Sequence, residues 1–141
     1  MTVRTASARY EGLGKAGKGH VSSQSGVLSD TAYGFNTRFG DEKGTNPEEL
    51  IAAAHASCFT MALSFALAKA GFEQGTLDTK AAVTLDPDGD GFKVTRSALT
   101  LQASVPGIDA DRFAEIAADA KANCPISKLL DAEITLDHTL S

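Results

Sequence analysis

Cysteine is scarce in this sequence, where Cys58 and Cys124 are the only two among 141 residues. Two cysteines are too few for a disulfide scaffold in a chain of this length. No basic amino-terminal region leads into an apolar core and a small-residue cleavage site, so we expect a cytoplasmic protein. A lasting structural disulfide is disfavoured in that reducing compartment. The favoured interpretation is therefore a transient, catalytic pairing of the two thiols.

Positive charge is also limited, because 13 Lys and Arg face 18 Asp and Glu, for a net charge of -5. No Lys/Arg cluster contradicts that average, so we expect no nucleic-acid partner and no binding to anionic membranes. The three histidines, His20, His55 and His138, are scattered, and no two share a short metal-ligand spacing. We therefore expect no metal. The composition, 43% hydrophobic and 22% charged, is typical of one globular domain.

A long helix is the most legible element. Asn46 is a favoured N-cap, Pro47 suits the first helical position, and Glu49 completes a capping-box-like pattern. No charged residue occurs from 50 to 68, and Gly71 marks the end, which predicts a helix over 47–70. Its alanine content and interspersed polar residues favour a buried helix over a membrane span. A helix apolar nearly all round must be covered on every side, so we infer a homodimer.

The remaining sequence predicts strands around that helix, in an α+β fold with the order β-rich, long helix, β, helix, β. We expect a single domain, with an N-terminal β region over 1–45, the central helix within 46–71 and a β-α-β region over 76–141. Within the first region, brief strands are expected at His20–Ser23, Gly26–Leu28 and Ala32–Phe39. Alternation slips near Arg96–Ala98, which indicates a bulge.

Two stretches resemble ligand-binding motifs without completing them. Residues 12–19 approach a phosphate-binding loop, but Gly19 stands where a hydroxyl should follow Lys18, and a strand-like segment follows. Residues 86–91 resemble half of a calcium loop, but Ser97 occupies the position that needs a glutamate. Both are better interpreted as turns.

The two cysteines lie in different environments. Cys58 sits in an apolar helix, where a thiol is by default a small core residue with a raised pKa and needs an imported cation to react. Cys124 precedes Pro125 at an expected N-cap, where backbone amides favour a thiolate. From the residues alone, Cys124 could even be the better nucleophile, and the order of attack stays open.

Arg38 is the nearest candidate cation in sequence, and its alternative is an ordinary surface arginine. Around the helix axis Glu48 falls about 80° from Cys58, whereas Glu49 falls about 180° away. Glu48 is therefore available to orient an arginine, or is simply a favourable charge in the first helical turn. His55, three residues before Cys58, is expected to be a packing residue or a contact to a second subunit rather than a catalytic one.

These residues resemble the OsmC family of osmotically inducible, peroxiredoxin-like proteins, relatives of the organic hydroperoxide resistance (Ohr) proteins. The resemblance covers essentially the whole chain, and it is carried by Tyr33-Gly-Phe-Asn-Thr-Arg38-Phe, Lys43-Gly-Thr-Asn-Pro-Glu48-Glu49-Leu, Ala54-His-Ala-Ser-Cys58-Phe, Asn123-Cys124-Pro125 and Ala132-Glu-Ile-Thr-Leu136.

The resemblance implies an α+β fold in which two chains intertwine around paired central helices, with active sites at the dimer interface. It implies that Cys58 is peroxidatic, that Cys124 is resolving, and that Arg38 and Glu48 activate Cys58. The expected activity is the reduction of organic hydroperoxides, and more weakly of hydrogen peroxide, in osmotic and oxidative stress. An external dithiol, such as a lipoyl-bearing protein, would restore the thiols, and no cofactor is implied. Phe59, Met61 and Phe65 suggest an apolar pocket near Cys58.

Two other functions are compatible with the residues. A general thiol–disulfide oxidoreductase is one, although the usual Cys-X-X-Cys spacing is missing. A non-catalytic dimeric binding module with inert thiols is the other, and in that case replacing either cysteine by serine should change no activity.

Overall fold

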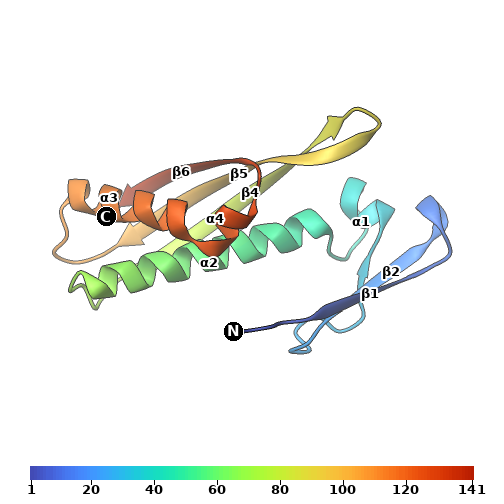
Figure 1. The fold of residues 1–141 in the computed structure, drawn as a ribbon, viewed down its shortest axis with the longest axis horizontal. Helices are drawn as coiled ribbons and strands as arrows, with labels where there is room; N and C mark the ends of the chain where they lie inside the picture. Colours follow the sequence, from blue (N-terminus) through green and yellow to red (C-terminus); the bar gives the residue numbers. More distant parts are fainter. The chain divides into compact units, whose positions relative to one another are not determined.

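The computed structural model describes all 141 residues and divides into two compact units, Met1–Leu50 and Ile51–Ser141. The N-terminal unit contains a three-stranded antiparallel sheet in the order β1-β2-β3 (Figure 1). Its elements are β1 (Ala6–Glu11), a short 3-10 helix η1 (Gly14–Ala16), β2 (Lys18–Ser23), β3 (Thr31–Tyr33) and α1 (Phe35–Phe39). The glycine-rich stretch thus forms the turn between β1 and β2, as the sequence predicts.

Two of the strand predictions in this unit are wrong. Residues 26–28 lie in bends, where Gly26 has a φ of 81° that a strand does not allow. Of the strand expected at Ala32–Phe39, only the start is extended, and Phe35–Phe39 forms α1. The two phenylalanines are four residues apart, so in a helix their rings meet, with centroids 5.1 Å apart. The same spacing looks like strand alternation in the sequence.

The long helix α2 runs from Pro47 to Lys69, which confirms the prediction. Asn46 caps it, because its Oδ1 accepts a hydrogen bond of 2.9 Å from the Glu49 backbone N–H. The capping box is only half formed, since the Glu49 carboxylate accepts from the Thr45 hydroxyl at 3.0 Å. By length and composition alone α2 could cross a membrane. It nevertheless buries a regular stripe, His55, Phe59, Leu63 and Leu67, as a core helix does.

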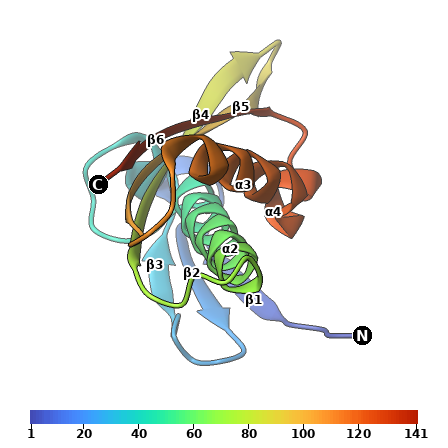
Figure 2. The same cartoon turned by 90° about the vertical axis from the view of Figure 1, so that its left-hand side faces the viewer.

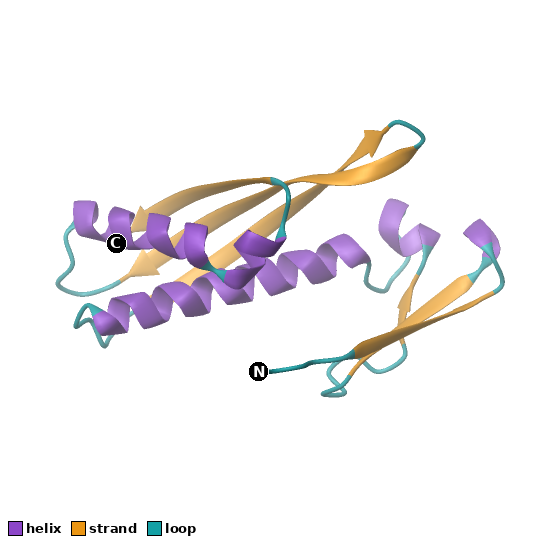
Figure 3. Ribbon diagram, viewed as in Figure 1, coloured by secondary structure: helices purple, strands orange, loops and turns teal.

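The C-terminal unit is a three-stranded sheet with helices on one face. Its strands are β4 (Thr76–Asp88), β5 (Gly91–Ser104) and β6 (Glu133–Leu140), in the order β4-β5-β6. β4 and β5 are antiparallel, whereas β5 and β6 are parallel. A parallel neighbour requires a crossover connection, which α3 (Ala110–Asn123) and α4 (Pro125–Leu129) provide. Figures 2 and 3 show α2 and α3 side by side along the long strands.

Several local predictions in this unit are confirmed. Asp109 caps α3, with its Oδ1 accepting from the Arg112 backbone N–H at 2.8 Å. A two-residue turn joins β4 to β5. The bulge lies at Thr95, which has no partner in β4 and is one residue before the predicted range that starts at Arg96. Antiparallel strands with segregated helices confirm the α+β class. The single-domain interpretation and the intertwined dimer stay predictions.

The core of the C-terminal unit lies between β5 and the helices. Its fully buried side chains come from α2, β5, α3 and the start of α4, and the largest of them include Phe59, Leu101 and Phe113. Cys124 belongs to this core with no exposed surface, while Cys58 packs against it half-buried.

Leu101→Ala tests the position of this core, because Leu101 is fully buried on the central strand. The cavity left behind should lower the free energy of unfolding by about 2–5 kcal/mol. Chemical denaturation measures the loss. Thr100→Val, on the exposed face of the same strand, is the control and should change stability by less than about 0.5 kcal/mol. Equal effects of the two substitutions would contradict the assignment.

Candidate functional site

Cys58 and Cys124 are brought together in the C-terminal unit by the packing of α2 against the start of α4. Both are free thiols, and they lie close enough for each to shift the pKa of the other. They are 66 positions apart in the chain (124 minus 58), so only the fold joins them. The pairing expected from their scarcity is therefore available without a change of fold.

The two thiols differ in how easily they ionise. Burial raises the pKa of Cys58 above its ordinary value, although the Ile126 backbone N–H opposes the effect. The hydrogen bond to Cys124, and the negative charge that sulfur can carry, raise the Cys58 pKa further. This agrees with the expectation that Cys58 needs a cation from elsewhere to react.

Cys124 has the opposite balance. Burial is the largest influence and would raise its pKa, but four hydrogen bonds to the sulfur outweigh burial, so the pKa is lowered. The donors are the backbone N–H and side chain of Ser127, the Cys58 thiol and the backbone N–H of Ile126. The Ser127 N–H lies 3.5 Å from Cys124 Sγ, which is the N-cap contact that the sequence predicts. Within this unit, Cys124 therefore has the lower pKa of the two thiols and is the first to ionise as pH rises.

His55 connects the same region to the sheet. Its side chain is fully buried, with Nδ1 2.6 Å from Ser97 Oγ on β5 and Nε2 2.8 Å from Ser127 Oγ on α4. Burial lowers the pKa of His55, so the ring is neutral at neutral pH. His55 is thus buried within its own chain and hydrogen-bonded on both ring nitrogens. Ser97 and Ser127 were missed by sequence reasoning, although a serine three residues after an N-cap is a signal for Ser127.

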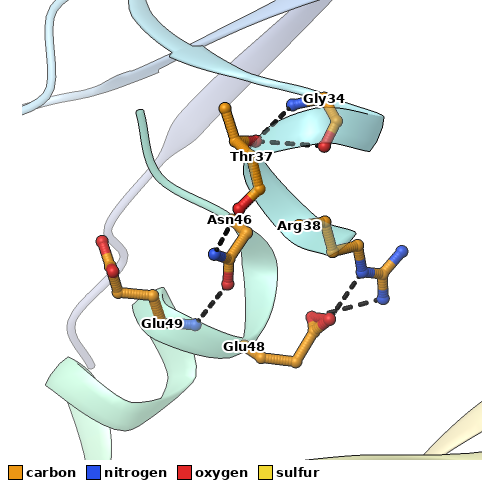
Figure 4. Close-up of polar contacts among 6 residues, drawn as sticks. All are labelled: Gly34, Thr37, Arg38, Asn46, Glu48 and Glu49. Atoms are coloured by element: carbon orange, nitrogen blue, oxygen red, sulfur yellow. Dashed lines mark hydrogen bonds and ion pairs between the residues drawn. The ribbon is translucent and has the colours of Figure 1, made fainter. Parts of the chain in front are cut away.

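Arg38 and Glu48 pair within the N-terminal unit. Arg38 Nε lies 2.5 Å from Glu48 Oε1, and Nη2 lies 3.2 Å from Oε2, in a two-pronged ion pair (Figure 4). The Glu48 side chain is only 12% exposed, whereas the Arg38 side chain is 35% exposed. The carboxylate therefore orients the guanidinium while Nη1 stays outside the pair, as Figure 4 shows.

The short helix α1 places Arg38 for this contact. The Thr37 hydroxyl accepts from the Gly34 N–H at 2.7 Å and donates to the Gly34 carbonyl at 3.0 Å, which closes the first turn (Figure 4). The Asn46 side-chain amide donates to the Thr37 carbonyl at 3.0 Å. Asn46 thus caps α2 and holds α1 at the same time, so Arg38 and Glu48 face each other.

An apolar cavity of about 390 Å³ adjoins Arg38 in the N-terminal unit. It is lined by Tyr10, Gly14, Lys15, Tyr33, Gly34, Phe35, Arg38, Phe39 and Pro47. The sequence predicts a different apolar pocket, beside Cys58 and formed by Phe59, Met61 and Phe65. These three side chains do not line one pocket, because Phe59 is buried in the core while Met61 and Phe65 are 60% and 69% exposed. Helical phase separates these three side chains.

The structure thus brings the four predicted site residues together as two pairs, each within its own unit. Cys58 and Cys124 belong to the C-terminal unit, and Arg38 and Glu48 to the N-terminal unit. No group of three or more His, Cys, Asp or Glu side chains is arranged to hold a metal ion. The chemistry available is that of thiols, a guanidinium and a carboxylate.

Comparison with known proteins finds relatives along nearly the whole chain. It is 56% identical to Peroxiredoxin OsmC of Escherichia coli over 141 residues, covering 99% of both chains. It is 31% identical to the organic hydroperoxide resistance protein OhrB of Bacillus subtilis, covering 91% of this chain and 90% of that one. The crystal structure of OhrB matches with a TM-score of 0.68, covering 97% of this chain and 98% of that one.

The family model described as OsmC-like protein matches residues 40–139, which include Glu48, Cys58 and Cys124. That match spans more than half of the chain and agrees with the likeness in sequence and fold to Peroxiredoxin OsmC and OhrB. The chain therefore belongs to the OsmC-like protein family.

Proposed function

We propose that this chain is a thiol-dependent peroxidase that reduces organic hydroperoxides to alcohols through Cys58 and Cys124. The contact between the two thiols carries the proposal, because it lets one sulfur be oxidised and the other close a disulfide on it. Family membership and the 56% identity to Peroxiredoxin OsmC support the same activity.

The proposed reaction has three steps. The Cys58 thiolate attacks the terminal peroxide oxygen, the O–O bond breaks, and a sulfenic acid forms while the alkoxide takes a proton and leaves as the alcohol. Cys124 then gives up its proton, and its thiolate attacks the Cys58 sulfur. The S–S bond forms, the S–O bond of the sulfenic acid breaks, and the departing hydroxide takes up the released proton to become water. An external dithiol reduces the disulfide by exchange and is itself oxidised. A lipoyl-bearing protein suits that last step.

Arg38 is proposed to decide which sulfur carries the negative charge. Within the C-terminal unit alone that charge favours Cys124, since the Cys58 pKa is raised and the Cys124 pKa is lowered. A guanidinium brought beside Cys58 in the working enzyme reverses this preference, because an opposite charge within about 4–6 Å stabilises a thiolate. The shared proton then moves to Cys124. Glu48 keeps the guanidinium oriented through the two-pronged pair.

The apolar cavity beside Arg38 supports organic hydroperoxides over hydrogen peroxide as substrates. Four aromatic side chains, Tyr10, Tyr33, Phe35 and Phe39, line the cavity. Such a lining favours an alkyl or aryl group, while a polar group at one edge fixes orientation. The guanidinium of Arg38 can hydrogen-bond the peroxide oxygens at that edge.

The working enzyme is proposed to be a cytoplasmic homodimer. Opposite its buried stripe, α2 exposes an uncharged stripe of Ala53, Ser57, Met61, Ser64, Phe65 and Ala68. Met61 is 60% exposed and Phe65 is 69% exposed. An uncharged helix face that exposes two large apolar side chains is a candidate interaction site, and α2 of a second copy offers the same surface in a symmetric contact.

Oxidation of the reduced protein by cumene hydroperoxide tests the order of the cysteines. Quenched samples analysed by mass spectrometry should contain an intramolecular Cys58–Cys124 disulfide in the wild type. Cys124→Ser should accumulate a sulfenic acid at Cys58, and Cys58→Ser should stay reduced. A sulfenic acid that accumulates at Cys124 in Cys58→Ser would reverse the proposed order. Turnover of insulin disulfides without peroxide consumption would instead indicate a general oxidoreductase.

Arg38→Ala tests the activating cation. Oxidation of Cys58 at neutral pH should slow by about 10- to 1,000-fold, because a nearby cation lowers a pKa by about 1–3 units and each unit changes the thiolate fraction about tenfold. Stopped-flow kinetics over a pH range should show the missing rate returning as pH rises. Arg96→Ala is the matched control, since it breaks another ion pair, the exposed contact of 3.4 Å to Glu133. Equal rates in wild type and Arg38→Ala would exclude the role.

Phe65→Glu tests the dimer. A charge placed in the exposed stripe of α2 should be costly to bury in a symmetric contact, because each copy brings the other a like charge. Sedimentation equilibrium should show a dimer for the wild type and a monomer for Phe65→Glu. Val27→Glu, at another exposed apolar position in the N-terminal unit, should leave the dimer intact. A monomeric wild type at micromolar concentration would disprove the proposal.

A further inference from the structure

His55 is a buried titratable residue that the three reaction steps leave without a role. It lies one helical turn before Cys58 on α2, with no exposed surface. Its two ring nitrogens contact serine hydroxyls on two other elements, Ser97 at 2.6 Å and Ser127 at 2.8 Å. Because both nitrogens have partners, the ring has one fixed orientation between β5 and α4.

Ser127 links this histidine to the Cys124 sulfur. Its hydroxyl lies against His55 Nε2, its backbone N–H points at Cys124 Sγ from 3.5 Å, and its side chain also hydrogen-bonds that sulfur. A continuous chain of contacts therefore runs from Ser97 through His55 and Ser127 to Cys124. All of these residues belong to the C-terminal unit.

The direction of the hydrogen bonds in this chain depends on the proton of Cys124. A neutral imidazole has one donor and one acceptor nitrogen. When Nδ1 accepts from Ser97, Nε2–H donates to Ser127 Oγ, and the Ser127 proton is left to point at the sulfur. In the other tautomer the Ser127 proton goes to Nε2, and Ser127 Oγ can accept from a Cys124 S–H. The first arrangement fits a thiolate and the second fits a thiol.

We propose that His55 is a positioning residue for Cys124, which anchors Ser127 and turns the Ser127 hydroxyl toward the sulfur as the thiolate attacks oxidised Cys58. This role deepens the proposed function and rests on the order of the two cysteines given there. The need is greatest at that step, because Cys58 has then lost the S–H that it donates to Cys124 in the reduced pair. Ser127 and the Ile126 amide are the donors that stay.

Other titratable groups near Cys124 are few. Cys58 faces it from α2, and His55 reaches it only through Ser127. Lys121 in the last turn of α3 and Lys128 in α4 are its nearest charged neighbours in sequence, and Lys128 is exposed. Both lysines are kept unchanged in the variants below, so their influence is the same in every comparison.

A single-thiol protein provides the direct test. In Cys58→Ser the only thiol is Cys124, and the serine hydroxyl still offers it a donor. The ultraviolet absorbance of the thiolate is followed against pH in this parent and after adding Ser127→Ala, His55→Asn or His55→Gln. Glutamine can place an N–H where Nε2 lies and so keep the bond to Ser127, whereas the shorter asparagine reaches only toward Ser97.

At pH values below the midpoint of the parent's titration, Ser127→Ala and His55→Asn should lower the thiolate fraction by about threefold to tenfold, the usual net effect of losing one hydrogen bond. His55→Gln should restore most of the parent's titration. A purely structural histidine predicts another result, in which the variants lose thermal stability but titrate like the parent, and that result would overturn the proposal. If His55→Asn does not fold, Ser127→Ala decides by itself.

Kinetics of the two-cysteine protein separate this role from the proposed peroxidase reaction. With His55→Asn, closure of the disulfide should slow by the same threefold to tenfold at neutral pH, since the attacking thiolate is scarcer, while oxidation of Cys58 keeps its rate. Slowing of Cys58 oxidation alone would contradict the proposal. A wild type that never oxidises Cys58 would disprove the peroxidase function, and the single-thiol titration would still decide the role of His55.

Discussion

The contact between the Cys58 and Cys124 sulfurs is the interaction on which the chemistry of this protein depends. The helix α2 contributes Cys58 from its uncharged stretch, and the start of α4 contributes Cys124 with amide donors around it. Two thiols in contact cannot ionise independently, because a charge on one raises the pKa of the other. The two thiols therefore titrate as a coupled pair, in which a charge on one sulfur disfavours a charge on the other.

Burial and hydrogen bonding compete over where that charge resides. Both sulfurs lose solvation in the protein, but only Cys124 receives enough donors to overcome the loss. Activation of Cys58 then requires a cation, and Arg38 is held ready by Glu48 in the N-terminal unit. The proposed mechanism therefore uses two different means to stabilise a thiolate, an arginine for the attacking sulfur and a capped helix start for the resolving one.

Local signals in the sequence predict a large part of this arrangement. Asn46, Asp109 and Cys124 each occupy the cap that their residue type and neighbours indicate, since capping depends on a few adjacent residues. The helix α1 was missed because Phe35 and Phe39 suit a strand as well as a helix. In the structure the Asn46 side chain binds the Thr37 carbonyl and so supports the helix. Such a contact across a loop has no local signature.

The contacts of His55 also could not be predicted from the sequence, because they join residues far apart in the chain. Its spacing from Cys58 predicts that both lie on one side of α2, yet nothing in the sequence identifies Ser97 and Ser127 as partners 42 and 72 positions away. The prediction of an apolar pocket beside Cys58 was wrong because it did not consider which way each side chain points around the helix. Helical phase sends Phe59 into the core and Phe65 outward, and the aromatic cavity is instead built from residues around α1.

The most direct test of the shared charge is a titration of the reduced wild type, with the β-carbons of both cysteines followed by nuclear magnetic resonance. Two coupled thiols should lose their protons in two well-separated steps, one below and one above the ordinary thiol pKa of about 8.5, with both carbons responding to each step. Two independent titrations, both near the ordinary value, would contradict the account.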